Sequence, residues 1–181
     1  MTLICRFMDS PVGQLKLLAR GNRLVGILWE NDRPGRVRLG LATEAPASDI
    51  LQRTEQQLNE YFAGTRTRFE LDLDFSGTDF QKKVWQALLT IPFGETRTYS
   101  QIALQVGSPA AVRAVGAANG KNPISIIAPC HRVIGMSGEL TGFAGGLAAK
   151  ELLLRLEGWD RSRVKEKVQG QKSKQGVLFQ D

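Results

Sequence analysis

The chain has 181 residues, 42% of them hydrophobic, which is enough for one domain or two small domains with adequate cores. It has no apolar run of about 18 residues, so a membrane-spanning helix is excluded, and polar residues at positions 9, 14 and 16 rule out a signal-peptide pattern. Two distant cysteines and one histidine argue against a disulfide framework and a zinc site. We therefore expect a cytoplasmic protein without metal or cofactor.

The formal net charge is +6, and its distribution is uneven. No Asp or Glu occurs between Glu95 and Glu139, and this interval contains the basic residues Arg97, Arg113, Lys121 and Arg132. A stretch of this kind predicts a positive field suited to a polyanion. The segment from position 161 onward is also basic, but its Gln, Lys, Gly and Ser content predicts a frayed tail without a catalytic role.

The first part of the chain has the pattern of a small antiparallel sheet backed by one helix. Short apolar segments at residues 3–8, 14–19 and 24–29 predict strands, and Gly21-Asn22 predicts a hairpin turn. Residues 31–45 are polar and predict a loop. Leu51, Leu58 and Phe62 then form the apolar stripe of an amphipathic helix that ends at Gly64. This part contains no catalytic grouping, and we interpret it as a scaffold.

The second part begins near Ser76 and is mostly helical. Thr78-Asp79 predicts a helix start, and Pro92 and Gly94 predict its end. Residues 98–101 form a capping box that opens a short helix, and Ser108-Pro109 predicts that the next helix begins there. Two helices joined in this way indicate a helix-turn-helix.

The second of these helices, at residues 110–118, carries almost only small side chains and one arginine, Arg113. It has few groups able to read base edges, but its slim profile fits the minor groove, where Arg113 could enter the base stack or contact phosphate. Close packing between helices, with Arg113 as an ordinary surface charge, explains the same pattern. Both interpretations stay open on these residues.

Cys130 and the single histidine, His131, are adjacent, after an apolar segment at residues 124–128 that predicts a buried strand. A thiolate is the nucleophilic form of cysteine, and an imidazole is its usual base near neutral pH. The pair therefore indicates a nucleophile at the mouth of a pocket. The alternative is a buried structural cysteine.

Several motifs together resemble the O6-alkylguanine-DNA alkyltransferases, over residues 80–158 closely and over residues 1–74 more loosely. They are Thr98-Tyr99, residues 111–116, Asn122-Pro123, residues 129–133, Gly145-Gly146 and Lys150-Glu151. Members of this family repair DNA by moving an alkyl group from O6 of guanine, and often from O4 of thymine, onto their own cysteine. The resemblance implies an α+β fold in which a small, ribonuclease H-like antiparallel sheet with a helix precedes a mostly helical domain containing the helix-turn-helix.

The resemblance also implies roles for individual residues. Cys130 would accept the alkyl group, His131 would deprotonate it through a bound water, and Glu151 would hold the His131 tautomer. Asn122 would tie the helix-turn-helix to the segment that carries Cys130. The substrate-binding residues would be Tyr99, Val133, Phe143 and Ala144, and DNA contacts would come from Arg113, Tyr99, Ala114, Gly116 and Lys121.

Two features depart from versions of this pattern. Some family members have Tyr-Ser where this chain has Phe143-Ala144, so the loop keeps its backbone amide but lacks two hydroxyl groups. The zinc ligands of some N-terminal domains are missing here, apart from an isolated Cys5.

We expect a scaffold domain at residues 1–75, a DNA-binding and alkyl-acceptor domain at 76–159, and a flexible basic tail at 160–181. The partner would be double-stranded DNA with alkylated bases, and no membrane. The protein would be a monomer, with clustering on DNA left open. Other classes to distinguish are a Cys-His-Glu hydrolase, a plain DNA-binding regulator and a lesion binder without catalysis, although the last of these lacks the acceptor cysteine.

Overall fold

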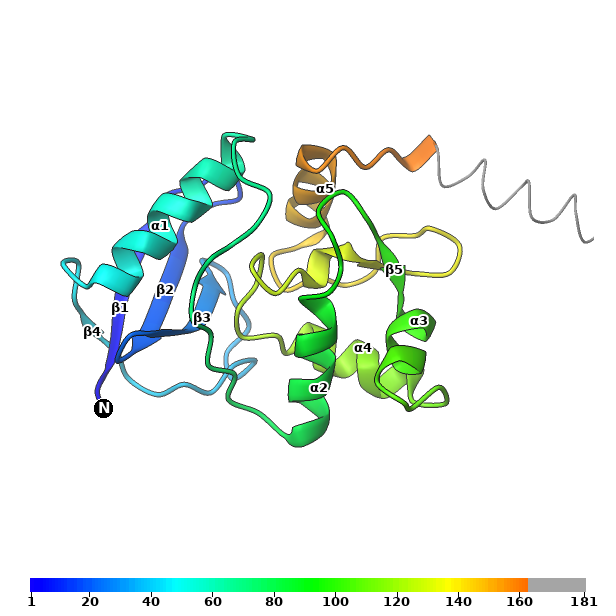
Figure 1. The fold of residues 1–181 in the computed structure, drawn as a ribbon, viewed down its shortest axis with the longest axis horizontal. Coiled ribbons are helices and arrows are strands. Elements are labelled where there is room, and N and C mark those ends of the chain that lie inside the picture. The colour runs from blue at the N-terminus through cyan, green and yellow to red at the C-terminus, as the bar shows by residue number, and fades with distance from the viewer. Residues whose placement is uncertain (163–181) are drawn as a thin grey trace, which may run out of the picture.

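A computed structural model describes residues 1–162 of the chain, and the sheet with its helix forms the first part of the fold. The sheet has the order β3-β2-β1-β4, made of β1 (Leu3–Met8), β2 (Leu15–Arg20), β3 (Arg23–Trp29) and β4 (Thr43–Glu44). Helix α1 (Asp49–Phe62) covers one face of this sheet (Figure 1). The predicted strands and helix are confirmed.

The β2–β3 hairpin turns at Gly21, whose φ of +58° is accessible to glycine without strain. The expectation of a purely antiparallel sheet is wrong at one edge, because β4 pairs parallel to β1. β4 lies within the polar residues 31–45, whose composition predicts a loop, and a two-residue strand is too short for alternation of side chains to reveal it.

The second part contains the remaining helices, on the other side of the linker that follows α1 (Figure 1). They are α2 (Asp79–Leu88), α3 (Tyr99–Gln105), α4 (Val112–Gly120) and α5 (Leu147–Leu156), with a 3₁₀ turn η1 (Cys130–Arg132) and the short parallel strands β5 (Arg97–Thr98) and β6 (Val133–Ile134). Complete capping boxes start α2 at Thr78 and α3 at Thr98; the helix start at Thr78 and the capping box at Thr98 were both predicted. Among residues 1–162 no helix is long and apolar enough to cross a membrane.

Two predicted elements differ in the structure. Helix α4 begins at Val112 and not at Ser108-Pro109, because residues 108–111 form a turn closed by the Ala111 amide donating to the Ser108 carbonyl. Residues 124–128 are buried as expected but do not form a strand. Ile124 alone bridges to Ile27, and Ile126 then turns the backbone with φ of +74°.

The two parts are joined through the edge strand β3. The Ile27 amide donates to the Pro123 carbonyl of the second part at 2.8 Å, and the Leu24 amide donates at 2.8 Å to the Asp72 carbonyl of the linker between the parts. One hydrophobic core extends from the sheet and α1 to Ile124, Ile126 and Leu153. The segment that leads into Cys130 is therefore built on the N-terminal sheet.

Candidate active site

Cys130 and His131 lie in η1, at the junction of both parts of the fold. Cys130 is 2% exposed and His131 is fully buried. Asn122, just after α4, binds both ends of the segment at residues 124–128, which precedes η1. Its Nδ2 donates to the Ala128 carbonyl at 2.7 Å, and its Oδ1 accepts from the Ile124 amide at 3.0 Å. Asn122 therefore connects the end of α4 to the segment before Cys130, in the place that the sequence analysis expected.

The carboxylate that contacts His131 is Glu157, and the assignment of Glu151 to this position is wrong. His131 Nε2 lies 2.8 Å from Glu157 Oε1, with both side chains fully buried. Glu151 instead points outward on α5, where it pairs with Arg155 at 2.8 Å and keeps a side-chain exposure of 40%. Glu157 follows α5 as its C-cap residue.

Arg132 neutralises Glu157 through a buried ion pair. Its Nε donates to Oε2 of Glu157 at 2.8 Å, its Nη2 donates to Oε1 at 2.9 Å, and its Nη1 donates to the Ile91 carbonyl at 2.5 Å. Burial raises the pKa of Glu157, but the hydrogen bonds and charges of His131 and Arg132 outweigh this and lower it to about 2. Glu157 is therefore a carboxylate at neutral pH.

An ionised Glu157 fixes the tautomer of His131, because a carboxylate can only accept a hydrogen bond. Nε2 must then carry the proton, so Nδ1 of the neutral ring has a free lone pair. Nδ1 is buried and has no hydrogen-bond partner among the residues that the structure describes. Burial lowers the pKa of His131, against the opposing effect of Glu157, so the ring is neutral and available as a base near pH 7.

The Cys130 thiol has a mixed environment. Burial raises its pKa, while hydrogen bonds from Asn122 and Ser125 and the positive charges of Lys150 and Arg36 act in the opposite direction. The thiol is therefore protonated at rest and needs a base to become nucleophilic.

Lys150 is a fully buried cation of α5 that sequence reasoning assigned no role. Its Nζ donates to the Val133 carbonyl at 2.6 Å and to the Thr141 carbonyl at 3.3 Å. Burial lowers the pKa of Lys150 to about 8, and the nearby Cys130 opposes that change. The Val133 carbonyl, expected to read the substrate, thus already accepts one hydrogen bond and has a second lone pair left.

The loop at residues 143–146 rests on the N-terminal sheet. Phe143 meets Trp29 of β3 edge to face with ring centroids 5.3 Å apart, and a Cβ atom at position 145 would come within 2.6 Å of the same indole. Trp29 Nε1 donates to Ser125 Oγ at 3.1 Å. Trp29 therefore contacts both the loop at residues 143–146 and, through Ser125, the segment that precedes Cys130.

Tyr99 begins α3 and faces this loop. Its hydroxyl shares a hydrogen bond of 2.7 Å with Thr141 Oγ1, and its ring is near Gly116 of α4. Burial raises the pKa of Tyr99, so its hydroxyl remains protonated and can donate a hydrogen bond.

Arg113, Ala114 and Lys121 are exposed on or just after α4. The uncompensated positive charge between Glu95 and Glu139 is smaller than the number of basic residues suggests. Arg132 is neutralised by Glu157, and Arg97 pairs with Glu95 at 2.8 Å. Arg113 and Lys121 are its exposed charges.

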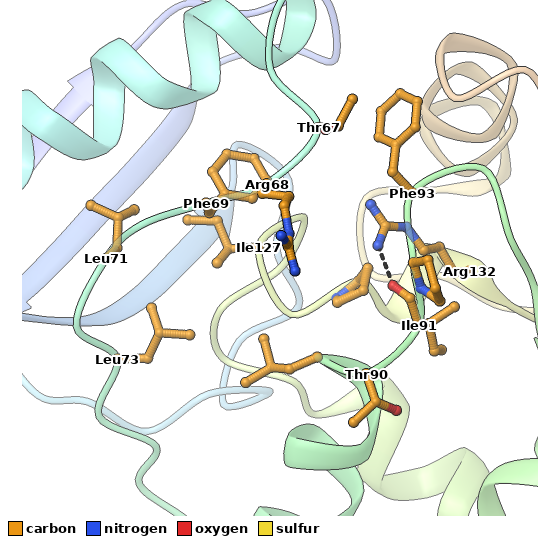
Figure 2. Close-up of a pocket in the computed structure, with 13 residues that line it drawn as sticks. Thr67, Arg68, Phe69, Leu71, Leu73, Thr90, Ile91, Phe93, Ile127 and Arg132 are labelled. Atoms are coloured by element: carbon orange, nitrogen blue, oxygen red, sulfur yellow. Dashed lines mark hydrogen bonds between the residues drawn. The ribbon is translucent and has the colours of Figure 1, made fainter.

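A groove of about 840 Å³ lies between the linker after α1 and the loop after α2, and Figure 2 shows Arg68, Phe69, Phe93 and Arg132 around it. Pro129 and Arg132 contribute to its wall, and Cys130 is not among its lining residues. The groove therefore borders Arg132, which pairs with Glu157, and not the thiol itself.

Comparison with known proteins identifies the family. The profile described as "6-O-methylguanine DNA methyltransferase, DNA binding domain" matches residues 79–159, and that of the "ribonuclease-like domain" matches residues 3–75. The methylated-DNA–protein-cysteine methyltransferase of Mycobacterium leprae is 52% identical over 153 residues, covering 84% of this chain and 91% of the relative. The chain belongs to this family.

Further matches agree with this assignment. The methylated-DNA–protein-cysteine methyltransferase of Methanosarcina acetivorans is 48% identical over 155 residues, covering 83% of this chain and 95% of that protein. The Mycobacterium tuberculosis O6-methylguanine methyltransferase structure has a TM-score of 0.78 at 51% identity, covering 86% of this chain and 93% of that one. The structure of Mycobacterium tuberculosis OGT in complex with DNA also has a TM-score of 0.78 at 51% identity, covering 84% and 91%. The α+β fold and the methyltransferase class expected from the sequence are confirmed.

Within this methyltransferase fold, the structure brings together Cys130, His131, Asn122 and Val133, and places Tyr99 beside the loop of Phe143 and Ala144. Glu157, Arg36 and Tyr61 also contribute to the site and were not predicted from the sequence. Arg36 reaches from the loop after β3 to the end of α4, where its Nη1 donates to the Asn122 carbonyl at 2.8 Å. Glu157 had a signal in the sequence, since it lies seven residues after Lys150 and four after Leu153, on the buried stripe of α5.

Proposed function

We propose that the protein repairs duplex DNA by transferring a methyl or larger alkyl group from O6 of guanine, and from O4 of thymine, to Cys130. The Cys130 sulfur–carbon bond forms while the carbon–oxygen bond breaks, and the bonding electron pair passes to the base oxygen. The product is a thioether, which neither hydrolysis nor thiol exchange reverses. Each protein molecule would therefore react once.

The observation that carries this proposal is the buried Cys130–His131–Glu157 arrangement, with the lone pair of His131 Nδ1 left free. In the reaction His131 takes the thiol proton through one bound water, and Glu157 stabilises the imidazolium that results. This is the role of the carboxylate in a Ser-His-Asp triad, applied to a thiol. Lys150 adds a positive charge that favours the thiolate.

The alkylated base must leave the helix to reach a buried thiol. Flipping a base costs a few kcal/mol, and less for a damaged pair. We propose that α3 and α4 act as a helix-turn-helix that enters the minor groove, where Ala114 and Gly116 allow close approach and Arg113 fills the gap in the base stack. Tyr99 helps to rotate the phosphate, and Lys121 contacts the backbone.

The extruded base is held by groups around η1. The carbonyls of Cys130 and Val133 accept from the guanine amino group, and the loop of Phe143 and Ala144 covers the base. The Tyr99 hydroxyl and the Ala144 amide donate to the developing negative charge on the base, which is the role of an oxyanion hole.

We further propose that residues 1–75 form a scaffold domain and residues 76–159 the DNA-binding and acceptor domain of a cytoplasmic monomer. The tail expected at residues 160–181 lies outside the described residues from position 163 onward.

The test is to incubate the protein with excess duplex containing O6-methylguanine and to measure its intact mass and modified peptide. We expect one added methyl group, on Cys130, with loss of transfer in Cys130→Ser and full transfer in the matched Cys5→Ser variant, since Cys5 is buried in the N-terminal part. Modification of Cys5 would refute the assignment. Several equivalents of product per protein would favour a Cys-His-Glu hydrolase.

A further inference from the structure

The phenol of Tyr61, on α1 of the N-terminal part, reaches the carboxylate that serves His131. Its hydroxyl donates to Glu157 Oε1 at 2.6 Å, and the Tyr61 side chain is fully buried. The two residues lie 96 positions apart in the chain. We infer that Tyr61 is a positioning residue for alkyl transfer, through which the N-terminal part holds Glu157 against His131. This inference rests on the proposed function and adds a residue to it.

The geometry at Glu157 shows what Tyr61 contributes. Oε1 accepts from the Tyr61 hydroxyl, from Arg132 Nη2 and from His131 Nε2, while Oε2 accepts from Arg132 Nε. Arg132 and His131 belong to the same 3₁₀ turn, so Tyr61 is the donor that comes from the other part of the fold. Without it, the hydrogen bonds to Oε1 from residues 1–162 all come from η1, and the carboxylate is freer to rotate away from His131.

The Tyr61 hydroxyl also reduces the negative charge that Glu157 Oε1 presents to His131. A hydrogen bond to a carboxylate disperses its negative charge and weakens its attraction for a neighbouring imidazolium. The other charged groups that act on the His131–Glu157 pair are Arg132 on η1 and Lys150 on α5, and a change at Tyr61 leaves them in place. Loss of the phenol hydrogen bond should therefore raise the pKa of His131.

A packing role for Tyr61 is the competing explanation. Its ring contacts Phe69 at a centroid distance of 5.5 Å and Phe93 at 6.2 Å, the latter edge to face. Phe69 and Phe93 also line the groove of Figure 2, so this aromatic cluster joins the two parts of the fold. Tyr61→Phe keeps the ring and removes only the hydroxyl, which separates packing from positioning.

The chain offers a matched control on the same helix. Thr54 is fully buried in α1, and its hydroxyl donates to the Ile50 carbonyl at 2.7 Å, within the helix. Thr54→Val likewise removes one buried hydroxyl from α1 but does not touch Glu157. Both variants should lose some thermal stability, so rates are measured at a temperature where thermal unfolding shows all proteins folded.

The experiment measures single-turnover alkyl transfer from free O6-benzylguanine between pH 5 and pH 9, which avoids any effect on DNA binding. For Tyr61→Phe we expect a rate lower by roughly five-fold, equivalent to about 1 kcal/mol, and an acid limb displaced to higher pH. Thr54→Val should keep the wild-type rate and profile. An unchanged rate in Tyr61→Phe, or a lower rate with an unchanged pH profile, would overturn the positioning role.

A second readout tests the contact without any reaction. His131 is the sole histidine of the chain, so its ring nitrogens can be followed by ¹⁵N NMR in histidine-labelled protein without assignment ambiguity. Tyr61→Phe should raise the His131 pKa and shift the Nε2 signal, and Thr54→Val should change neither. If wild type fails to alkylate Cys130 the proposed function is wrong, whereas unchanged His131 signals in Tyr61→Phe refute the Tyr61 inference alone.

Discussion

Glu157→Gln should weaken both the fold and the alkyl transfer, because this carboxylate is a buried charge shared by His131 and Arg132. Its pKa in the folded protein is about 2, compared with an ordinary value of 4.5. That difference corresponds to roughly 3 kcal/mol of stability at neutral pH. Breaking a buried ion pair by removing one charge costs a similar 3–5 kcal/mol or so. We therefore expect a loss of about 3 kcal/mol in the free energy of unfolding at pH 7.

Because the pKa of Glu157 is lowered in the folded protein, the stabilisation that it provides depends on pH. A carboxylate with a lowered pKa stabilises the folded state above its ordinary pKa, and this contribution is lost as the pH falls from 4.5 towards 2. The difference in unfolding free energy between wild type and Glu157→Gln should therefore be largest at pH 6–7 and shrink below pH 4.5. Urea unfolding followed by fluorescence at pH 7, 4.5 and 3.5 measures it.

Transfer to Cys130 should slow by roughly 100-fold or more, because a Gln side chain cannot compensate the imidazolium and can present an amide donor to His131. Glu151→Gln is the matched control on the same helix. Its pair with Arg155 is exposed and should contribute no more than about 0.5 kcal/mol. A wild-type rate in Glu157→Gln, or a slow reaction in Glu151→Gln, would refute the assignment of the carboxylate.

Further predictions concern DNA. Arg113→Ala should lose much of its reaction with alkylated duplex while reacting almost normally with free O6-benzylguanine, because only the duplex substrate requires base extrusion; equal losses on both substrates would mean that Arg113 supports the fold or the pocket. Binding to undamaged duplex should weaken steeply with salt and show little sequence preference, and Lys121→Ala should reduce the slope of log affinity against log salt by about 1. Arg97→Ala should change that slope less, because Arg97 already pairs with Glu95.

The sequence predicted most of the elements because their signals are local. Capping boxes at Thr78 and Thr98, the hairpin glycine at position 21 and the apolar stripe of α1 each depend on residues within one or two turns. The strand predicted at residues 124–128 is wrong because a segment buried on all sides is apolar whether its backbone forms a strand or a turn. Its path is set by hydrogen bonds with Asn122 and by a long-range bridge to Ile27, and no local pattern encodes that bridge.

The proposed nucleophile, Cys130, and its proposed base, His131, could be found from their adjacency, but their supporting groups could not. Tyr61 and Trp29 enter the site through packing between the two parts of the chain, and nothing in their own neighbourhoods indicates it. Arg132 was counted as a free positive charge for the same reason, although Glu157 neutralises it. Contacts across 25 to 96 residues determine these roles.

The assignment of Glu151 rested on the resemblance of Lys150-Glu151 to a family motif and took no account of the helical phase of α5. Glu151 pairs with Arg155 at i and i+4, which places both on the outer face of α5. Lys150, Leu153 and Leu154 form the inner face, and continuing that spacing by one turn reaches Glu157. An acidic residue on an apolar stripe must be neutralised when buried, and Arg132 and Lys150 are the available buried cations. The phase of α5 alone would thus have selected the carboxylate that the structure places on His131.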